Sequence, residues 1–198
     1  MRILVPSYGR DGTATTMNLL PSAQAVVPED GEACFMVDDD LLEVLKIKHG
    51  KMDDIEQTLE AFANLADEMG VYFGGFSIYS DPVKYAEYAP FSFTKPCYQC
   101  VYIRRDSELT YDEDLGRYED ADIYLQYMLK HRIVLRDNRY HFRFECNKDT
   151  TNKTQRGGIE HNESRHGLAL DKLIRRWGDL IKQKDGRMNG VNQPIQGI

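Results

Sequence analysis

The sequence lacks any hydrophobic run of the roughly 20 residues that a membrane-spanning helix needs. The first residues, Met1-Arg2-Ile3-Leu4-Val5-Pro6, are also too few for the apolar core of a secretion signal. These two absences predict a cytoplasmic protein that has no membrane partner.

Cysteine is scarce, because the 198 residues contain 4 cysteines, too few and too scattered for a disulfide scaffold. Cys97 and Cys100 have the CxxC spacing of a redox pair or of half a zinc site, but no further ligands lie at a suitable spacing. We therefore expect inert thiols on a strand that runs from Cys97 to Ile103. The sequence also contains no Walker loop, no dinucleotide-binding glycine fingerprint and no nucleophile elbow.

The composition excludes a disordered, coiled-coil or collagen-like chain. Hydrophobic residues make up 41% of the sequence, aromatic residues 11% and charged residues 29%, a balance that suits a packed core. The length fits one domain, which we place at residues 1–183. Residues 184–198 contain much Gly, Asn, Gln and Pro, and we expect them to form a flexible C-terminal tail.

Charge is distributed unevenly along the chain, whose formal net charge is −7. Residues 1–120 contain 10 Lys and Arg against 23 Asp and Glu, a balance of −13, and residues 121–198 contain 15 against 9, a balance of +6. Such a split suits a protein that holds a cation with one part and a polyanion with the other. Uneven surface charge without a role is the alternative interpretation.

Short apolar runs alternate with helical spacing, a pattern typical of an α/β fold. Residues 53–69 carry apolar side chains at steps of three and four and are followed by Gly70, which predicts a helix. Gly74 and Gly75, in the strand expected at 71–78, would allow another backbone or a ligand to approach closely. Further helices are expected at 13–20, at 119–130 and, with an amphipathic pattern, from Leu170 to Ile181; further strands are expected at 2–6, 25–27, 33–37, 133–135 and 140–144.

Three aspartates directly follow the strand expected at 33–37. In an extended segment alternate side chains share a face, so Asp38 and Asp40 can converge on one cation while Asp39 points elsewhere. Neighbouring carboxylates repel each other unless a cation or a hydrogen-bond donor neutralises them, and their oxygens suit Mg²⁺ or Mn²⁺. The alternative is an ordinary helix start, where Asp is favoured by capping and by the helix dipole.

An acidic pair, Glu119 and Asp120, opens the helix expected at 119–130. A carboxylate at this position can act as a general base for an attacking hydroxyl when its neighbours tune its pKa. Acidic residues are also ordinary at a helix start, so this pair is a weaker indication of chemistry than the three aspartates.

Two further groups could contact a metal or a phosphate. Alternation along residues 139–143 places His141 on a cationic, solvent-facing side, where it could complete a metal shell or contact phosphate. A strand histidine without a role is the alternative. The polar segment that contains Lys153 and Arg156, followed by Arg165, could close over a diphosphate.

The order of these segments resembles that of glycosyltransferases of the GT-A type. The closer resemblance is to bacteriophage enzymes, often called TET-associated glycosyltransferases, that attach sugars to hydroxymethylated cytosine in DNA. It extends through most of the chain and is carried by Val5-Pro6-Ser7-Tyr8-Gly9-Arg10, Met36-Val37-Asp38-Asp39-Asp40-Leu41, Leu65-Ala66-Asp67-Glu68-Met69-Gly70, Gly74-Gly75-Phe76-Ser77, Tyr111-Asp112-Glu113-Asp114-Leu115, Tyr118-Glu119-Asp120-Ala121-Asp122, Leu135-Arg136-Asp137-Asn138-Arg139-Tyr140-His141-Phe142 and the segment from Asn152-Lys153 to Gly157-Gly158.

The resemblance implies a compact, Rossmann-like mixed sheet flanked by helices, and transfer of a sugar from a nucleotide-sugar donor, expected to be a UDP-sugar, to a DNA hydroxyl. By similarity, Asp38 and Asp40 would bind Mn²⁺ or Mg²⁺, and Glu119 or Asp120 would face the acceptor hydroxyl. A bacteriophage enzyme of this kind would act in the host cytoplasm. The residues expected to contact the donor are Pro6, Ser7, Tyr8 and Arg10 around the nucleotide, and Asp39, Lys153, Arg156 and Arg165 near the diphosphate.

Three alternatives are left open by the sequence. The first is a related transferase whose acceptor is a glycan, a protein or a small molecule. The second is a metal-dependent phosphodiester hydrolase, in which clustered carboxylates hold two ions and water is the nucleophile. The third is a non-catalytic nucleic-acid-binding protein, because only 27 residues separate Arg10 from Asp38, where related enzymes place another strand and helix.

Overall fold

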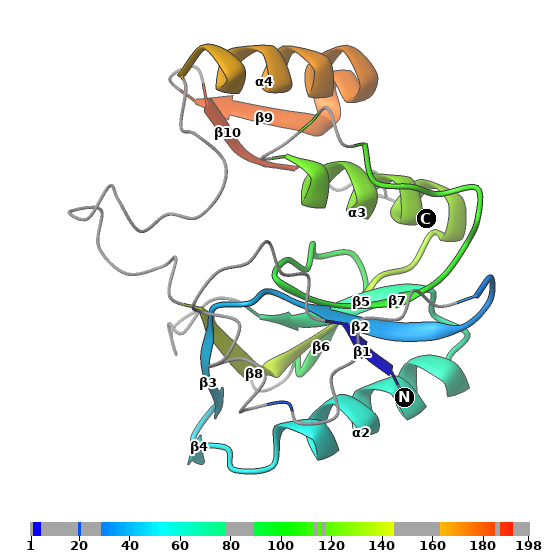
Figure 1. The fold of residues 1–198 in the computed structure, drawn as a ribbon, viewed down its shortest axis with the longest axis vertical. Helices are drawn as coiled ribbons and strands as arrows, with labels where there is room; N and C mark the ends of the chain where they lie inside the picture. The colour runs from blue at the N-terminus through cyan, green and yellow to red at the C-terminus, as the bar shows by residue number, and fades with distance from the viewer. Residues whose placement is uncertain are drawn as a thin grey trace.

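The fold has a mixed β-sheet as its central layer, with helices on both faces (Figure 1). Helix α2 (Ile55–Glu68) covers one face, and helix α3 (Glu119–His131) covers the other. Helix α4 (Glu163–Trp177) and a small β-hairpin lie beyond α3, on the side away from the sheet. The computed structural model describes residues 2–4, 20, 29–77, 89–112, 115, 118–144, 163–184 and 187–191.

The sheet contains eight strands in the order β1-β2-β7-β5-β8-β3-β4, with β6 paired to β8. The pairs β1–β2 and β5–β8 are parallel, and the other pairs are antiparallel. The strands are β1 (Arg2–Leu4), β2 (Ala33–Val37), β3 (Leu41–Lys46), β4 (Gly50–Lys51), β5 (Phe73–Ser77), β6 (Phe91–Ser92), β7 (Cys100–Arg104) and β8 (Leu135–Phe144).

The sheet is curled, as the link between β2 and β3 requires. In the order of hydrogen-bonded strands, β7, β5 and β8 lie between these two, so in a flat sheet they would be about 19 Å apart at about 4.8 Å per strand. The chain passes from Val37 to Leu41 in four residue steps, which reach at most about 14 Å. Strand β8 makes the bend possible, because its first part pairs with β5, its last part pairs with β3, and the pairing register with β5 shifts in between.

Helix α2 has a defined start and end. Asp54 is the N-cap, and its carboxylate accepts a hydrogen bond from the backbone N–H of Gln57 at 2.9 Å. Gly70, with φ +66°, follows the helix in the left-handed conformation that glycine tolerates best. The buried side of the helix recurs at steps of three and four, as the sequence predicts, and consists of Ile55, Thr58, Leu59, Phe62, Ala63 and Ala66.

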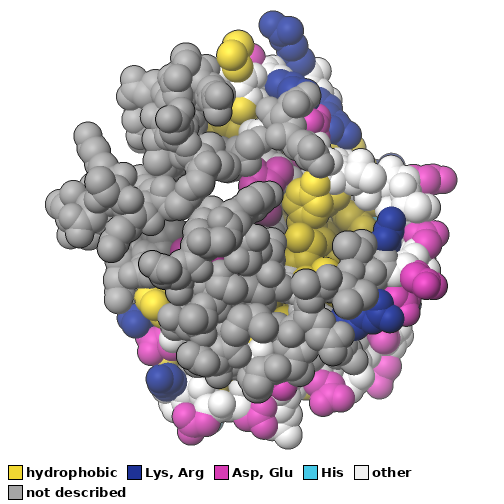
Figure 2. Space-filling model, viewed as in Figure 1, with side chains coloured by type: hydrophobic (Ala, Val, Ile, Leu, Met, Phe, Trp, Pro, Cys, Tyr) yellow, Lys and Arg dark blue, Asp and Glu magenta, His cyan; other side chains and the backbone are white. Residues whose placement is uncertain are grey.

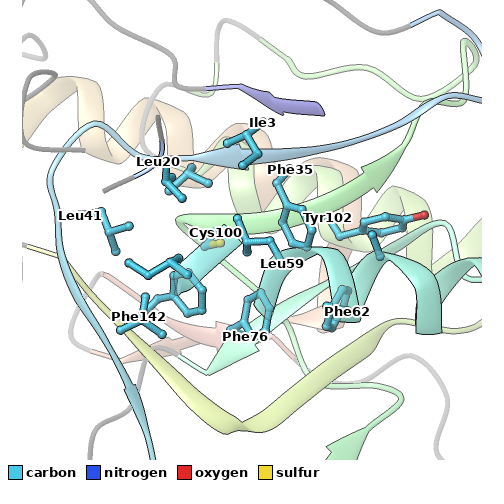
Figure 3. Packing of buried hydrophobic residues seen from close by; sticks show 14 of the residues in the cluster. Ile3, Leu20, Phe35, Leu41, Leu59, Phe62, Phe76, Cys100, Tyr102 and Phe142 are labelled. Carbon is cyan, nitrogen blue, oxygen red and sulfur yellow. The ribbon is translucent and has the colours of Figure 1, made fainter. Parts of the chain in front are cut away.

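The core between α2 and the sheet is rich in aromatic rings (Figure 3). Phe62 of α2 lies with its ring centroid 4.9 Å from that of Phe76 and 5.7 Å from that of Phe35. Phe142 stacks on Phe76 at 4.4 Å and so extends the cluster to β8. These contacts join four separate elements, β2, α2, β5 and β8, into one core.

Positions 74 and 75 require glycine because neighbouring backbone and side-chain atoms approach them closely, as the sequence predicts. A Cβ atom at Gly74 would lie 2.4 Å from the carbonyl oxygen of Leu135 and 2.8 Å from the ring of Phe62. A Cβ atom at Gly75 would lie 2.5 Å from the carbonyl oxygen of Cys100. The glycine pair therefore lets β5 pack between β7, β8 and α2.

Helix α3 is buried around much of its circumference. Every residue from Ala121 to Met128 is buried, which a helix achieves only when it is covered on several sides. One side faces the sheet through contacts such as that of Tyr127 with Phe73, whose ring centroids lie 5.2 Å apart. The other side faces α4, which contributes Leu170 and Leu173 to the same core.

The C-terminal part differs from the flexible tail predicted from residue 184. The structure contains a hairpin of β9 (Ile181–Lys184) and β10 (Arg187–Val191), and residues 192–198 lie outside the described part. The amphipathic helix predicted from Leu170 is confirmed as the second half of α4, although it ends at Trp177 and Ile181 already belongs to β9. Asn189 and Gly190 indicated irregular chain, whereas both belong to β10.

The predicted α/β class is confirmed, and the mixed sheet with flanking helices agrees with it. The strands predicted at 133–135 and 140–144 prove to be one long strand, β8. The helix predicted at 13–20 and the strand predicted at 25–27 fall mostly or wholly outside the described residues. In the part of the chain that is described, no helix is both long and apolar enough to span a membrane.

Candidate active site

The three aspartates form the corner between β2 and β3, and Asp39 and Asp40 lie in a turn, so the extended segment expected from the sequence is wrong here. Asp38 follows the last residue of β2, and its backbone N–H donates to the carbonyl oxygen of Gln99 at 2.8 Å. Asp39 is buried, and Asp38 and Asp40 are half-buried. Because a strand follows these residues directly, the alternative of an ordinary helix start is wrong.

Glu119 and Asp120 are the first two residues of α3, as the sequence predicts. The N-cap residue, Tyr118, makes no side-chain cap hydrogen bond, and its ring is buried against the core instead. The acidic side chains of the first turn interact favourably with the positive end of the helix dipole. The start of α3 is thus a place where the fold tolerates negative charge.

The two acidic segments meet in one site, although Asp38 and Asp120 are 82 positions apart in the sequence. The pKa of Asp38 is raised to about 8, first by burial and then by the negative charge of Asp120, with smaller effects from Asp40, Asp39 and Glu119. A nearby like charge raises the pKa of a carboxyl group in this way. We call Asp38, Asp39, Asp40, Glu119 and Asp120 the carboxylate site.

Glu119 and Asp120 also resist ionisation. Burial and the neighbouring charge of Glu119 raise the pKa of Asp120 to about 7. Burial raises the pKa of Glu119, and its Oε2 atom is buried without a hydrogen-bond partner among the described residues. The site therefore retains protons near neutral pH, and it would lose them to a bound cation.

Tyr111 borders the carboxylate site and was not predicted as a site residue. Its pKa is raised well above the ordinary value by burial and by the negative charges of Asp120, Glu119 and Asp38. The phenol therefore stays protonated at neutral pH and can donate a hydrogen bond. In the sequence, Tyr111 stands out only as part of a segment that resembles the glycosyltransferases, because nothing local to Tyr111 indicates which carboxylates it will approach.

A hydrogen-bonded frame holds the segment that carries Tyr111. The side chain of Gln126 in α3 donates to the carbonyl oxygen of Thr110 at 2.9 Å and accepts from the N–H of Thr110 at 3.3 Å. On the other side, Lys172 of α4 pairs with Asp112 at 2.8 Å. Tyr111 is thus fixed between residues that α3 and α4 hold in place.

Asp122 connects α3 to α4 beneath this frame. Its carboxylate is fully buried and accepts hydrogen bonds from Trp177 Nε1 at 2.7 Å, Arg176 at 3.1 Å and Gln126 Nε2 at 2.6 Å. The sequence places Asp122 in the acidic start of α3 but gives no sign that it differs from Glu119 and Asp120. The structure separates them: the first two belong to the carboxylate site, and Asp122 anchors a helix.

His141, predicted as a metal ligand, has a different environment from the one expected. It is 4% exposed, so the prediction of a solvent-facing side is wrong at this residue. Its Nδ1 lies 3.3 Å from the carbonyl oxygen of Ser77, and burial lowers its pKa, with the charge of Arg143 acting in the same direction and Ser77 and Glu43 opposing it. A role of His141 beside Asp38 and Asp40 stays a prediction.

Most of the residues predicted to contact the donor cannot be placed. Asp39 lies in the carboxylate site. Arg165 belongs to α4, but its side chain is outside the described part. The remaining predicted donor contacts lie outside the described residues: Pro6, Ser7, Tyr8, Arg10, Lys153 and Arg156.

The CxxC thiols behave as the sequence predicts. Cys97 and Cys100 are both free and buried. Burial raises the pKa of Cys97 to about 12 and that of Cys100 well above its ordinary value, so neither is a thiolate at neutral pH. The strand expected from Cys97 begins only at Cys100.

The carboxylate site fits a hard divalent cation in its donor chemistry. Mg²⁺ is usually held by one or two carboxylates together with substrate phosphates, and Asp38 and Asp40 supply such a pair. The buried, unsatisfied Oε2 of Glu119 is a further oxygen in the same site. Among the described residues, no group of three or more His, Cys, Asp or Glu side chains is arranged to hold a metal ion, so a cation at the carboxylate site would need ligands beyond these side chains.

Comparison with known proteins gives no relative, because no protein-family model, curated protein or solved structure matches the chain. What defines the site is its own geometry: carboxylates from a strand end and a helix start, with a protonated phenol at their border. Figure 2 shows acidic side chains near the middle of one face of the molecule, next to an apolar patch.

Proposed function

We propose that the protein is a divalent-cation-dependent glycosyltransferase that moves a sugar from a nucleotide-sugar donor to a hydroxyl group, with 5-hydroxymethylcytosine in DNA as acceptor. The observation that carries this proposal is the meeting of the Asp38–Asp40 corner with Glu119 and Asp120 in one half-buried site. Transfer from a nucleotide sugar needs both features: oxygens for a cation beside the diphosphate and a base beside the acceptor.

Asp38 and Asp40 are the residues that would hold Mn²⁺ or Mg²⁺. The ion would neutralise the negative charge that develops on the leaving diphosphate. Their position supports this role, because the end of a strand in an open α/β sheet is the usual place for a phosphate-bearing ligand. The assignment of a GT-A fold belongs to the same proposal and is supported by the mixed sheet with an acidic strand end.

Asp120 is the residue that would accept the proton of the acceptor hydroxyl. Its pKa of about 7 suits a general base that works near neutral pH. Glu119 keeps this value high through its charge, and the protonated phenol of Tyr111 can donate a hydrogen bond to the ionised carboxylate or to the substrate. The resemblance of the sequence to enzymes that glycosylate DNA supports DNA as the acceptor.

The test is mass spectrometry of an oligonucleotide that contains hydroxymethylcytosine, after incubation with a panel of nucleotide sugars and Mn²⁺. We expect a mass gain of one sugar with at least one donor. Asp120→Asn should slow the transfer by about 10²- to 10⁴-fold, the usual contribution of a general base, and Asp40→Asn should abolish it. Asp171→Asn, on the exposed side of α4, is the matched control and should leave the rate unchanged.

An unchanged mass with every donor, obtained with folded protein, would contradict the proposal. Thermal unfolding gives a second measurement: Mn²⁺ with a UDP-sugar should raise the melting temperature of the wild type by mass action and should not raise that of Asp40→Asn. Equal shifts in both proteins would place the cation elsewhere.

A metal-dependent phosphodiester hydrolase is the second candidate. It is favoured by the presence of two carboxylate pairs in one site, because two ions can share such a set. Nicking of plasmid DNA with Mg²⁺ and without any sugar donor would establish it, and its loss in Asp38→Asn would assign it to this site.

A further inference from the structure

The turn between β3 and β4 carries a concentration of positive charge. Residues 46–51 read Lys-Ile-Lys-His-Gly-Lys and contain no carboxylate, although they belong to the acidic half of the chain. The backbone turns through Lys48 and Gly50, with φ +68° and +84°, and the residues from Lys48 to Lys51 are exposed. Figure 2 shows Lys or Arg side chains at the lower left, with Asp or Glu side chains beside them, where Figure 1 draws β3 and β4.

Cations and aromatic rings alternate where this turn meets β8. The guanidinium of Arg139 lies 4.7 Å from the ring centroid of Phe91 and 5.6 Å from that of Tyr140. The ammonium of Lys46 lies 5.5 Å from the Tyr140 centroid. Contacts between cations and rings therefore run without a break through Phe91, Arg139, Tyr140 and Lys46. Cation–π contacts are uncommon enough that three in one place indicate a surface with a role.

The pairing of the strands explains why these residues meet. Strand β6 and strand β3 both pair with β8, β6 at Asp137 and β3 at Tyr140. Arg139 lies at the junction, where its carbonyl oxygen accepts from the N–H of Ile47 at 2.9 Å. Asp137 receives two hydrogen bonds from the Arg139 guanidinium, from Nε at 3.0 Å and from the terminal nitrogen at 2.7 Å, and so fixes its plane.

An exposed aromatic ring continues the surface. Phe93 follows β6 and is 46% exposed. Its carbonyl oxygen accepts from the N–H of Val134 at 2.9 Å, which holds the segment beside the start of β8. We call the following residues the basic-aromatic surface: Lys46, Lys48, Lys51, Phe93, Arg139 and Tyr140.

We propose that the basic-aromatic surface binds single-stranded nucleic acid. The lysines of the turn contact phosphates, and the rings of Phe93 and Tyr140 provide surfaces on which bases stack. Aromatic faces beside clustered cations are the combination that sequence-tolerant single-strand binding uses, whereas phosphate contact alone needs no rings. This inference deepens the proposed function, because it locates the nucleic acid, and it rests on the DNA acceptor suggested there.

The surface is placed so that a bound strand can reach the carboxylate site. Strand β3 joins them directly: it begins at Leu41, next to Asp40, and ends at Lys46. Five residue steps along a strand cover about 17 Å. A single strand of the roughly 4–16 nucleotides that such sites usually bind would therefore extend from the turn to the carboxylates.

The test measures binding of a fluorescent single-stranded oligonucleotide of mixed sequence by fluorescence anisotropy, without sugar donor and without divalent cation. We expect Lys46→Gln, Lys48→Asn and Lys51→Gln, combined in one variant, to weaken binding at least about tenfold and to reduce the slope of log affinity against log salt by about 2. The combination Phe93→Ala with Tyr140→Leu should weaken binding and leave the salt slope unchanged.

The control is a variant that removes three exposed cations elsewhere: Arg132→Asn, Arg175→Gln and Lys182→Gln. It carries the same net charge as the lysine variant and should bind like the wild type. Equal weakening in both variants, no binding by the wild type, or binding to anionic phosphatidylserine vesicles but not to the oligonucleotide would each overturn the inference.

Crosslinking gives a measurement that does not depend on the folding of a variant. Ultraviolet irradiation of the wild type with a bromodeoxyuridine oligonucleotide should yield crosslinked peptides that contain Phe93 or Tyr140, and crosslinks confined to other peptides would overturn the inference. Binding of the oligonucleotide without sugar transfer would support the basic-aromatic surface and count against the proposed function. Sugar transfer to a mononucleoside without binding of the oligonucleotide would support the proposed function and overturn the basic-aromatic surface.

Discussion

At the scale of single residues, the distinguishing property of this protein is a group of acidic side chains that hold their protons. Asp38 and Asp120 combine burial with the charge of their neighbours, and their pKa values rise to about 8 and about 7. When such groups ionise, the free energy of unfolding of the protein falls. This cost is acceptable where a ligand offsets it, which is why perturbed carboxylates point to a functional site.

The raised pKa of Asp38 predicts how stability depends on pH. The carboxyl ionises near pH 4 in the unfolded chain and near pH 8 in the folded one, so between these values the folded state binds more protons and the free energy of unfolding falls as pH rises. Urea unfolding of cation-free protein at several pH values should show this fall, and Asp38→Asn should reduce it.

Glu60→Gln, on the exposed side of α2, is the control for this measurement and should keep the wild-type dependence on pH. A slope that is the same in Asp38→Asn and in the wild type would mean that Asp38 is ionised throughout the range.

At the scale of secondary-structure elements, the sequence was most informative where periodicity is local. Helices α2 and α3 and strand β2 follow from the spacing of apolar residues and from Gly70. Strand β3 was not predicted because it is stabilised by a partner distant in sequence, β8, about a hundred residues later. The β9–β10 hairpin was not predicted because its Asn and Gly residues indicated irregular chain. Asp38 and Asp120 could be selected from the sequence, whereas Tyr111 and Asp122 could not, since tertiary neighbours define their roles.

A pair of glycine substitutions tests the packing of β5 between its neighbours. Gly74→Ala should lower the free energy of unfolding by about 2–3 kcal/mol, because its Cβ would lie 2.4 Å from a backbone oxygen that cannot move aside. Gly167→Ala, in helix α4 with no atom within 4 Å of the added Cβ, should raise it by about 0.5–1 kcal/mol. Urea unfolding measures both, and effects of the same sign would show that the close approach at Gly74 is wrong.

At the scale of the whole molecule, the layers are held together by different means. The sheet and α2 share an aromatic core, whereas α4 is joined to α3 through apolar contacts and one buried carboxylate. Asp122 therefore affects more than its immediate contacts, because it holds in place α3, the helix whose first residues, Glu119 and Asp120, belong to the carboxylate site.

Asp122→Ala should lower the free energy of unfolding by about 2–4 kcal/mol, because it leaves the Trp177 N–H, the Gln126 amide and the Arg176 guanidinium without their shared acceptor. Asp122→Asn keeps an acceptor oxygen and should cost less. Asp171→Ala, on the exposed side of α4, should change the value by no more than about 0.5 kcal/mol. A loss for Asp122→Ala no larger than that control would show that apolar contacts alone hold α4.

The tight corner at residues 38–40 also restricts how the gene can vary. Because only three residues connect the end of β2 to the start of β3, losing a codon there would disturb the pairing of one of these strands, whereas exchanging one acid for another would leave the path of the chain intact. Natural variants of this protein should therefore show substitutions but no deletions between Val37 and Leu41, even if the surrounding turns change length freely.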